Sequence, residues 1–151
     1  MNSGPTRPVR AWMPVVAWMS LMFTMSTDLG STTNSSRLLE PLVRWFVPQM
    51  SPEMFASIHY LARKAAHLTE YAILAVLVRR ALRAGAAIRS PQQSWRPDLL
   101  AWVWAAVFAM SDEFHQSFVA SRGASVRDVF IDAAGAAIGL AIIRAVTLLR
   151  S

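Results

Sequence analysis

Four acidic side chains lie between two long apolar runs, and this arrangement limits the possible folds more than any other feature of the chain. The acids belong to the segment 111–139, which begins at the end of one apolar run and ends inside another: Asp112, Glu113, Asp128 and Asp132. An ionisable side chain at the centre of a membrane span costs about 2.5–3.5 kcal/mol, whereas one at the mouth of a span costs much less. We therefore predict a helical hairpin whose polar connection lies at the mouth of a membrane bundle.

The composition is typical of a small membrane protein with several spans. Of the 151 residues, 54% are hydrophobic and only 16% are charged, and the mean hydropathy is positive. The chain has no cysteine, which excludes disulfides, thiolate metal sites and cysteine nucleophiles. The net charge is +6, but the arginines flank apolar runs, which favours membrane topology and anionic lipid headgroups over nucleic acid.

The apolar runs predict a single all-α domain over 1–151, an integral membrane bundle of four transmembrane helices. The expected spans cover about 9–26, 62–82, 98–117 and 127–149. The first run also fits a signal peptide, but no clear Ala-x-Ala cleavage site follows it, which favours a retained span. Ser51, Pro52 and Glu53 form a good helix start, so the second of these helices is expected to begin before its membrane part and to end near Leu82.

A polar and then amphipathic region separates the first two spans. We expect a polar loop over 26–36. Residues 37–47 place leucine, valine and phenylalanine at helical spacing, but they are too few and too charged to span a bilayer. They predict a short extracytoplasmic helix that lies on the membrane surface, or one that packs on the outer mouth of the bundle.

The arginines predict the orientation of the bundle. The N-terminal tail, the 79–97 loop and the C-terminal end carry nine arginines, whereas the opposite side carries six basic residues spread over longer segments. Since cytoplasmic loops are enriched in basic residues, both termini are expected in the cytoplasm. Eight of the nine acids then fall on the outer side, and only Asp98 lies inside.

With that topology, three polar segments reach the same depth in the outer half of the bundle. They lie on the second span, at the end of the third, and at the start of the fourth: Lys64, His67, Glu70 and Tyr71; Ser111, Asp112, Glu113 and Gln116; and Arg122, Ser125, Asp128 and Asp132. On the second span, the other three residues lie three or four positions from His67, so the set shares one helix face. Such a set could supply an acid and a base or bind a charged headgroup. The spacing matches no compact metal motif, so we predict no metal site, and the sequence leaves any cofactor open.

Several of these residues also have structural explanations. Ser125 and Asp128 fit a capping box, in which the serine hydroxyl accepts from a free amide of the first helical turn. Asp132 lies a full turn further in, so capping does not explain it. Its expected partner is one of three cationic or titratable side chains: Arg122, Lys64 or His67.

Two further pairs are explained by contacts between helices. His67 and Tyr71 could form hydrogen bonds from one helix to another. Gly135 and Gly139 are four residues apart with alanines nearby, a pattern that lets two helix backbones approach closely. The residues alone therefore leave two interpretations of the polar cluster. It is either a binding or catalytic site, or a set of structural contacts between helices.

Three motifs resemble the VanZ-like family of small bacterial membrane proteins, and the resemblance covers most of the chain. Residues 23–26 (FTMS) resemble the end of that family's first span. Residues 63–74 resemble its RK-x-x-H-x-x-EY-x-x-L pattern. Residues 111–132 resemble its SDE-x-x-Q-x-F…R…S-x-x-D-x-x-x-D/N signature, and a G-x-x-x-G pattern follows. The departure is Ala120-Ser121, where the family usually has Pro-Gly.

The resemblance implies a multi-pass protein of the bacterial cytoplasmic membrane. The family is named for a protein linked to resistance to the glycopeptide antibiotic teicoplanin. The leading hypothesis is an envelope protein whose outward polar site binds an envelope component or the antibiotic and lowers teicoplanin susceptibility. The second is an enzyme acting on a lipid-linked envelope headgroup, and the third is a lipid or small-solute transporter working as a homo-oligomer. Expected partners are the lipid bilayer and an envelope lipid or glycopeptide, and not nucleic acid.

Overall fold

The computed structural model describes residues 6–85, 95–120 and 123–150, and over these residues the protein is helical with no strand. Five α-helices and one short 3₁₀ helix follow one another: α1 (Thr6–Met25), η1 (Asp28–Gly30), α2 (Thr32–Phe46), α3 (Pro52–Gly85), α4 (Arg96–Gln116) and α5 (Val126–Leu148). The predicted all-α class is confirmed.

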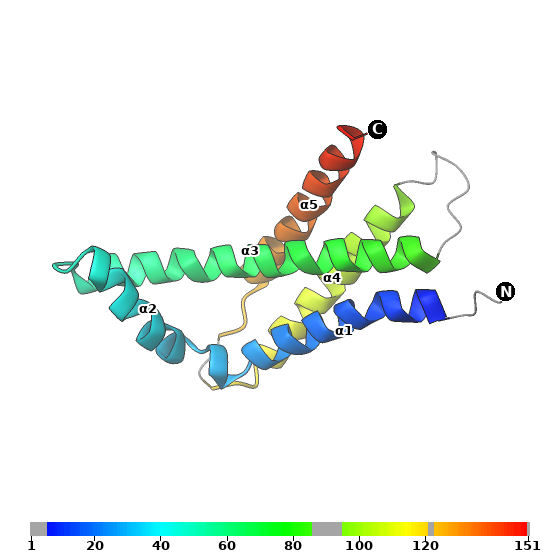
Figure 1. The fold of residues 1–151 in the computed structure, drawn as a ribbon. Coiled ribbons are helices and arrows are strands. Elements are labelled where there is room, and N and C mark those ends of the chain that lie inside the picture. Colours follow the sequence, from blue (N-terminus) through cyan, green and yellow to red (C-terminus); the bar gives the residue numbers. More distant parts are fainter. Residues whose placement is uncertain (1–5, 86–94, 121–122, 151) are drawn as a thin grey trace.

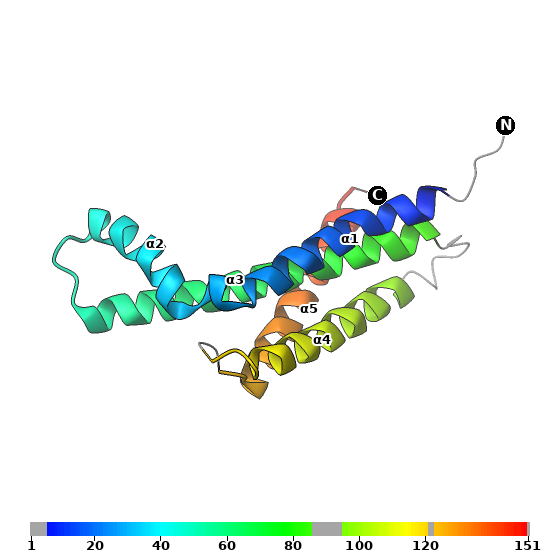
Figure 2. The same cartoon turned by 90° about the horizontal axis from the view of Figure 1, so that it is seen from below.

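The 34-residue helix α3 is the axis of the molecule. In Figures 1 and 2, α2 lies beside its first half and α1 beside its second half, while α4 and α5 pack across the second half. Its most extensive contacts are with α5, followed by those with α1 and α4. The Ser51 hydroxyl accepts from the Met54 amide at 3.2 Å, and Glu53 lies in the first turn, as the sequence predicts for this helix start.

Small side chains allow the helices to pack closely. The buried core combines several alanines with Tyr71, Leu74 and Val78 of α3. At the crossing of α3 and α5, a Cβ added to Gly135 would lie 2.4 Å from the Leu68 carbonyl oxygen. One added to Gly139 would lie 2.6 Å from the Ala72 carbonyl oxygen. This is the geometry of a small-residue contact between two helices.

The region before α3 differs from the prediction. Instead of a polar loop over 26–36, the structure has η1 and the first turn of α2, which begins at Thr32 rather than at residue 37. The reason is an N-cap, because the Ser31 hydroxyl accepts from the Asn34 amide at 3.3 Å. None of the residues of α2 is buried, and its apolar side chains are among the most exposed of the described residues: Leu38, Leu42, Trp45 and Phe46.

Membrane character is visible in part of the fold. By length and composition, α5 is the one described helix that could cross a membrane, and a shorter apolar helical stretch covers Val9–Met25. Large apolar side chains also point outward from α4 and α5, including Val107, Phe130 and Ile142, each more than half exposed. Such a surface is typical of a chain that contacts lipid or a partner. The count of four spans and the cytoplasmic termini remain predictions.

Candidate functional site

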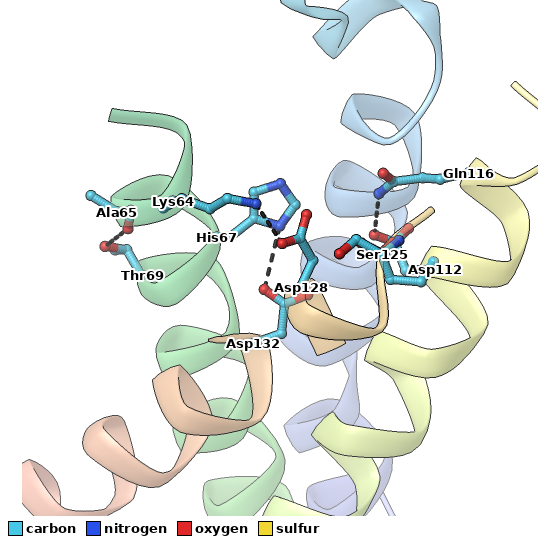
Figure 3. A network of polar contacts seen from close by, with 10 residues as sticks. Lys64, Ala65, His67, Thr69, Asp112, Gln116, Ser125, Asp128 and Asp132 are labelled. Carbon is cyan, nitrogen blue, oxygen red and sulfur yellow. Dashed lines mark hydrogen bonds and ion pairs between the residues drawn. The ribbon is translucent and has the colours of Figure 1, made fainter. Parts of the chain in front are cut away.

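The predicted polar segments of α3, α4 and α5 lie close together near one end of the helix bundle. Figure 3 shows Lys64 and His67 of α3 facing Asp128 and Asp132 of α5, with Asp112 of α4 beside them. The convergence follows from the order of the helices. The cluster lies partway along α3, at the end of α4 and at the start of α5, so the turn between α4 and α5 places their acids at one level.

Two contacts between a basic and an acidic side chain join α3 to α5. Lys64 Nζ lies 2.5 Å from Asp128 Oδ1, and both side chains are about four-fifths buried. His67 Nδ1 lies 3.4 Å from Asp132 Oδ1, which is longer than a well-formed hydrogen bond. Asp132 is fully buried. Of its expected partners within the described residues, Lys64 and His67, the structure places His67 beside it.

The acids of α4 make different contacts. Asp112 Oδ2 accepts from the Gln116 side-chain amide at 2.9 Å. Glu113 Oε2 accepts from the Ser125 backbone amide at 2.7 Å. The second oxygens, Asp112 Oδ1 and Glu113 Oε1, are buried and form no hydrogen bond with any residue of the described part. An unpaired buried carboxylate oxygen is costly, and a ligand, an ion or water could satisfy it.

Two of the structural explanations, the Ser125 cap and the Tyr71 hydrogen bond, are wrong. Ser125 stands at the N-cap of α5, but its hydroxyl accepts no capping hydrogen bond. Glu113 of α4 accepts from the Ser125 backbone amide, which is the role that a capping box gives to Asp128. The Tyr71 hydroxyl is buried and has no hydrogen-bond partner in the described ranges, so it does not join helices in that way. Ser111 is exposed and donates to the Phe108 carbonyl within its own helix at 2.8 Å. Arg122 lies outside the described residues.

A cavity of about 150 Å³ opens beside the cluster. Four of the predicted residues line it: His67, Glu70, Asp112 and Gln116. The buried contacts of Lys64, Asp128, Asp132 and Glu113 lie outside its walls. The polar cluster therefore has two parts, a lined cavity and a set of paired charges between helices next to it.

The rest of the cavity wall was not predicted. It comes from α1, η1, α2 and neighbouring positions of α3: Met22, Met25, Ser26, Gly30, Ser35, Arg63 and Ala66. The Arg63 guanidinium donates to the Gly30 carbonyl at 3.0 Å and so holds the η1 segment over the cavity. The adjacent basic pair Arg63-Lys64 was a usable signal for Arg63. Nothing local in the sequence indicates Gly30 or Ser35, because they reach the cavity only through contacts of η1 and α2 with α3.

A histidine outside the predicted spans ties α2 to α3. His59 Nε2 lies 2.9 Å from the Ser35 hydroxyl, and the side chain is buried. Burial lowers the pKa of His59 below its ordinary value, and the nearby Arg63 guanidinium lowers this pKa further. The neutral ring is therefore the form that this contact favours.

The described residues contain no group of three or more His, Asp or Glu side chains arranged to hold a metal ion. The arrangement can bind a polar group through one arginine, two carboxylates and the amide of Gln116. A histidine set beside a buried carboxylate could also exchange a proton with such a group.

A comparison with known protein families gives one match. A model of the VanZ/LLP1 family matches residues 11–149, from α1 to the end of α5. The chain belongs to the VanZ/LLP1 family. The residues that carry the resemblance to this family surround the cavity: Ser26 ends its first motif, His67 and Glu70 stand in its second, and Asp112 and Gln116 in its third. No curated protein and no solved structure matches the chain.

Proposed function

We propose that this protein is a bacterial envelope membrane protein that lowers susceptibility to teicoplanin by binding an envelope component in its outward-facing polar cavity. Membership of the VanZ/LLP1 family supports the envelope setting. The observation that carries the binding proposal is Asp112, a buried acid that lines the cavity with one oxygen bonded to Gln116 and the other without a hydrogen bond to the described residues.

The size of the cavity favours part of an envelope component over a whole antibiotic. Its volume of about 150 Å³ lies below the roughly 300–1,000 Å³ of pockets that bury drug-sized ligands. A glycosylated heptapeptide antibiotic is larger than such ligands. One sugar, amine or amino-acid group of a lipid-linked precursor is a better match. The two carboxylates would bind its amine or hydroxyl groups, while Met22 and Met25 would contact its apolar part.

The proposal is tested by susceptibility. The protein is expressed in a teicoplanin-sensitive host, and the inhibitory concentrations of teicoplanin and vancomycin are measured against the same host with an empty vector. We expect the inhibitory concentration of teicoplanin to rise, and to rise by more than that of vancomycin. No change for either antibiotic, with the protein present in the membrane at measured levels, would remove the resistance function.

A second candidate function is favoured by the His67–Asp132 pair. His67 lines the cavity and places Nδ1 3.4 Å from the fully buried Asp132 carboxylate. A carboxylate that orients a histidine toward a pocket is the arrangement of a general base. In this version the protein is a membrane enzyme that acts on a lipid-linked envelope headgroup.

Turnover of purified protein with envelope lipids separates the enzyme from the binding protein. If the enzyme version holds, His67→Gln lowers turnover by about 10²–10⁴-fold, and Asp112→Asn abolishes it while the thermal midpoint is retained. If no headgroup is converted by the wild-type protein, the enzyme version fails and the binding version stands. If Asp112→Asn only unfolds the protein, the cluster is structural.

A further inference from the structure

An apolar groove runs along the bundle between α1 and α4. These two helices run in the same direction, and each packs against α3 (Figures 1 and 2). The groove consists of two neighbouring hollows of about 490 and 410 Å³, which share Met19 and Phe108. We call it the α1/α4 groove, and its walls are formed mainly by six side chains: Val16, Met19 and Phe23 of α1, and Trp104, Val107 and Phe108 of α4. None of the described residues that line it is charged.

Two aromatic contacts bridge α1 and α4 and set the length of the groove. The ring centroids of Trp12 and Trp104 lie 5.4 Å apart, and those of Phe23 and His115 lie 4.3 Å apart. Both helices advance by eleven residues from the first contact to the second, so they keep one register over about 16 Å. One half of the hydrocarbon core of a bilayer is about 15 Å thick. The groove is therefore long enough for one hydrocarbon chain of a lipid.

The α1/α4 groove reaches the level of the polar cavity. On α1, Met22 lines the cavity and the next residue, Phe23, lines the groove. On α4, Asp112 lines the cavity and the preceding residue, Ser111, lines the groove. Consecutive residues of a helix differ little in height but point about 100° apart around its axis. The cavity and the groove thus lie on neighbouring sides of the same two helices, which suits a ligand with a polar head and an apolar chain.

The wall of the groove favours a flexible chain over a helix from a second copy. Helices that associate within membranes present small residues, which let the two backbones approach closely. The α1/α4 groove is lined mainly by large side chains instead, among them Met19, Leu100, Trp104 and Phe108. A hydrocarbon chain can bend to follow such a surface, whereas a helix is a rigid cylinder about 10–12 Å across.

We propose that the α1/α4 groove holds one hydrocarbon chain of a lipid whose amine-bearing headgroup occupies the polar cavity. This site extends the proposed function, on which it rests, and names the class of its ligand. Asp112 supplies an acceptor for the headgroup, because it lines the cavity and its buried Oδ1 forms no hydrogen bond to the described residues. A primary ammonium group can donate to such a carboxylate in a charge-assisted hydrogen bond.

The experiment maps where a photoreactive lipid binds. The purified full-length protein in detergent is given phosphatidylethanolamine that carries a diazirine on one acyl chain, and the adducts formed on illumination are located by peptide mass spectrometry. We expect more adducts at Met19 and Phe108 than at Ile142, which lines an apolar groove between α3 and α5. Equal labelling of the two grooves overturns the proposal, because it is the pattern of unspecific contact with lipid.

Val16→Trp and Val9→Trp are a matched pair on α1. Val16 lines the groove and is 61% exposed, whereas Val9 is 67% exposed, precedes the Trp12–Trp104 contact and is not part of the groove wall. Val16→Trp should lower the labelling about tenfold, since losing the burial of two methylene groups suffices for such a change. Val9→Trp should keep wild-type labelling.

Val107→Trp places the same obstruction on α4 and should also lower the labelling. Val16 and Val107 are both more than half exposed, so the variants are expected to fold, and the thermal midpoint checks this. Labelling that stays at the wild-type level in both groove variants overturns the proposal. An equal loss in Val9→Trp and Val16→Trp also overturns it.

A second arm tests the headgroup. Phosphatidylcholine with the same diazirine chain has no N–H donor, so we expect it to label the groove less than phosphatidylethanolamine does. Ala66→Leu, which fills the polar cavity, should lower the labelling by phosphatidylethanolamine. Equal labelling by the two lipids, or wild-type labelling of Ala66→Leu, overturns the placement of the headgroup in the cavity.

A third arm tests a second copy as the occupant. Ser20 lines the groove, and the chain has no cysteine, so Ser20→Cys introduces a single thiol. The lipid assignment predicts that this variant stays monomeric when oxidised with copper phenanthroline in lipid vesicles. Rapid formation of a disulfide-linked dimer would place a second copy in the groove and overturn the assignment.

The labelling is measured without any antibiotic, so its outcome is separate from that of the susceptibility test. Labelling of the groove without any effect on teicoplanin removes the resistance function and leaves the lipid site. An effect on teicoplanin with evenly spread labelling removes the lipid site and leaves the resistance function.

Discussion

At the scale of single residues, the charged side chains of the polar cluster are of two kinds: those that lie beside a basic or acidic partner, and those that do not. Lys64 and Asp128 neutralise one another between α3 and α5, and His67 does the same for the buried Asp132 to the extent that its ring is protonated. Asp112 is different, because it lines the cavity and its buried Oδ1 forms no hydrogen bond to the described residues. Paired charges fix the helices, and the incompletely bonded acid is what makes the cavity a candidate for binding.

His59 should make the attachment of α2 depend on pH. Its pKa is lowered in the folded protein, so the folded state binds fewer protons than the unfolded chain. The Ser35–His59 contact therefore contributes fully above the ordinary histidine value of 6.5 and is lost as the pH falls below it toward the lowered pKa. We expect the thermal midpoint in detergent to fall on acidification from about pH 8 to 5.

The variant His59→Gln isolates this contribution. Glutamine can still bond to the Ser35 hydroxyl but does not titrate, so the fall in the midpoint over this range should be reduced. An unchanged pH profile in His59→Gln would assign the acid sensitivity to other groups. Hydrogen exchange restricted to the amides of α2 should show where the protein opens first.

At the scale of elements, the sequence predicts the long helices well because their signals are local. Ser51 and Pro52 begin α3 as expected, although its end at Gly85 lies three residues past the predicted Leu82. The predicted end of α5 differs by a single residue. The start of α2 was missed because the Ser31 cap stands within a run of polar residues that also suits a loop.

The candidate site could be predicted only in part, because the patterns that can be read from the sequence are local. The regular spacing of Lys64, His67 and Glu70 on one helix identified the α3 face. The hydrogen bond in which Glu113, rather than Asp128, accepts from the Ser125 backbone amide joins residues twelve apart, and Arg63 reaches Gly30 across 33 residues. Contacts at such separations depend on how whole helices pack, which no local pattern of residues encodes.

The crossing of α3 and α5 gives a test of packing. Gly139→Ala would place a Cβ 2.6 Å from the rigid carbonyl oxygen of Ala72, so the helices must move apart. We expect a loss of stability of about 1–2 kcal/mol, since the overpacking cost exceeds the gain of about 0.5–1 kcal/mol from replacing a helical glycine. The measurement is thermal or denaturant unfolding in detergent.

Gly123→Ala is the control for this substitution. A Cβ at Gly123 has no neighbour within 4 Å, so stability should change by less than about 0.5 kcal/mol. Equal stability of Gly139→Ala and the wild type would show that α3 and α5 do not cross as closely as described.

At the scale of the whole molecule, the predicted topology places the polar cavity toward the outside and the last turn of α3 in the cytoplasm. Because the chain has no cysteine, a single introduced cysteine is the one thiol of the protein that a maleimide can label. The orientation can therefore be tested by labelling. Gln49 follows α2 and Ala84 lies in the last turn of α3, and both are exposed. An impermeant maleimide should label Gln49→Cys on intact cells and Ala84→Cys only after lysis. The reverse pattern would invert the proposed topology.

One pair of substitutions tests directly whether the cavity itself acts on teicoplanin susceptibility. Ala66 lines the polar cavity, whereas its neighbour Ala65 lines an apolar groove on another side of α3. Ala66→Leu fills the cavity without changing any charge, and Ala65→Leu adds the same atoms outside it. The measurement is the teicoplanin inhibitory concentration of a sensitive host that expresses each variant at equal membrane levels. We expect Ala66→Leu to lose the protection and Ala65→Leu to retain it; full protection by Ala66→Leu would contradict a role of the cavity in resistance.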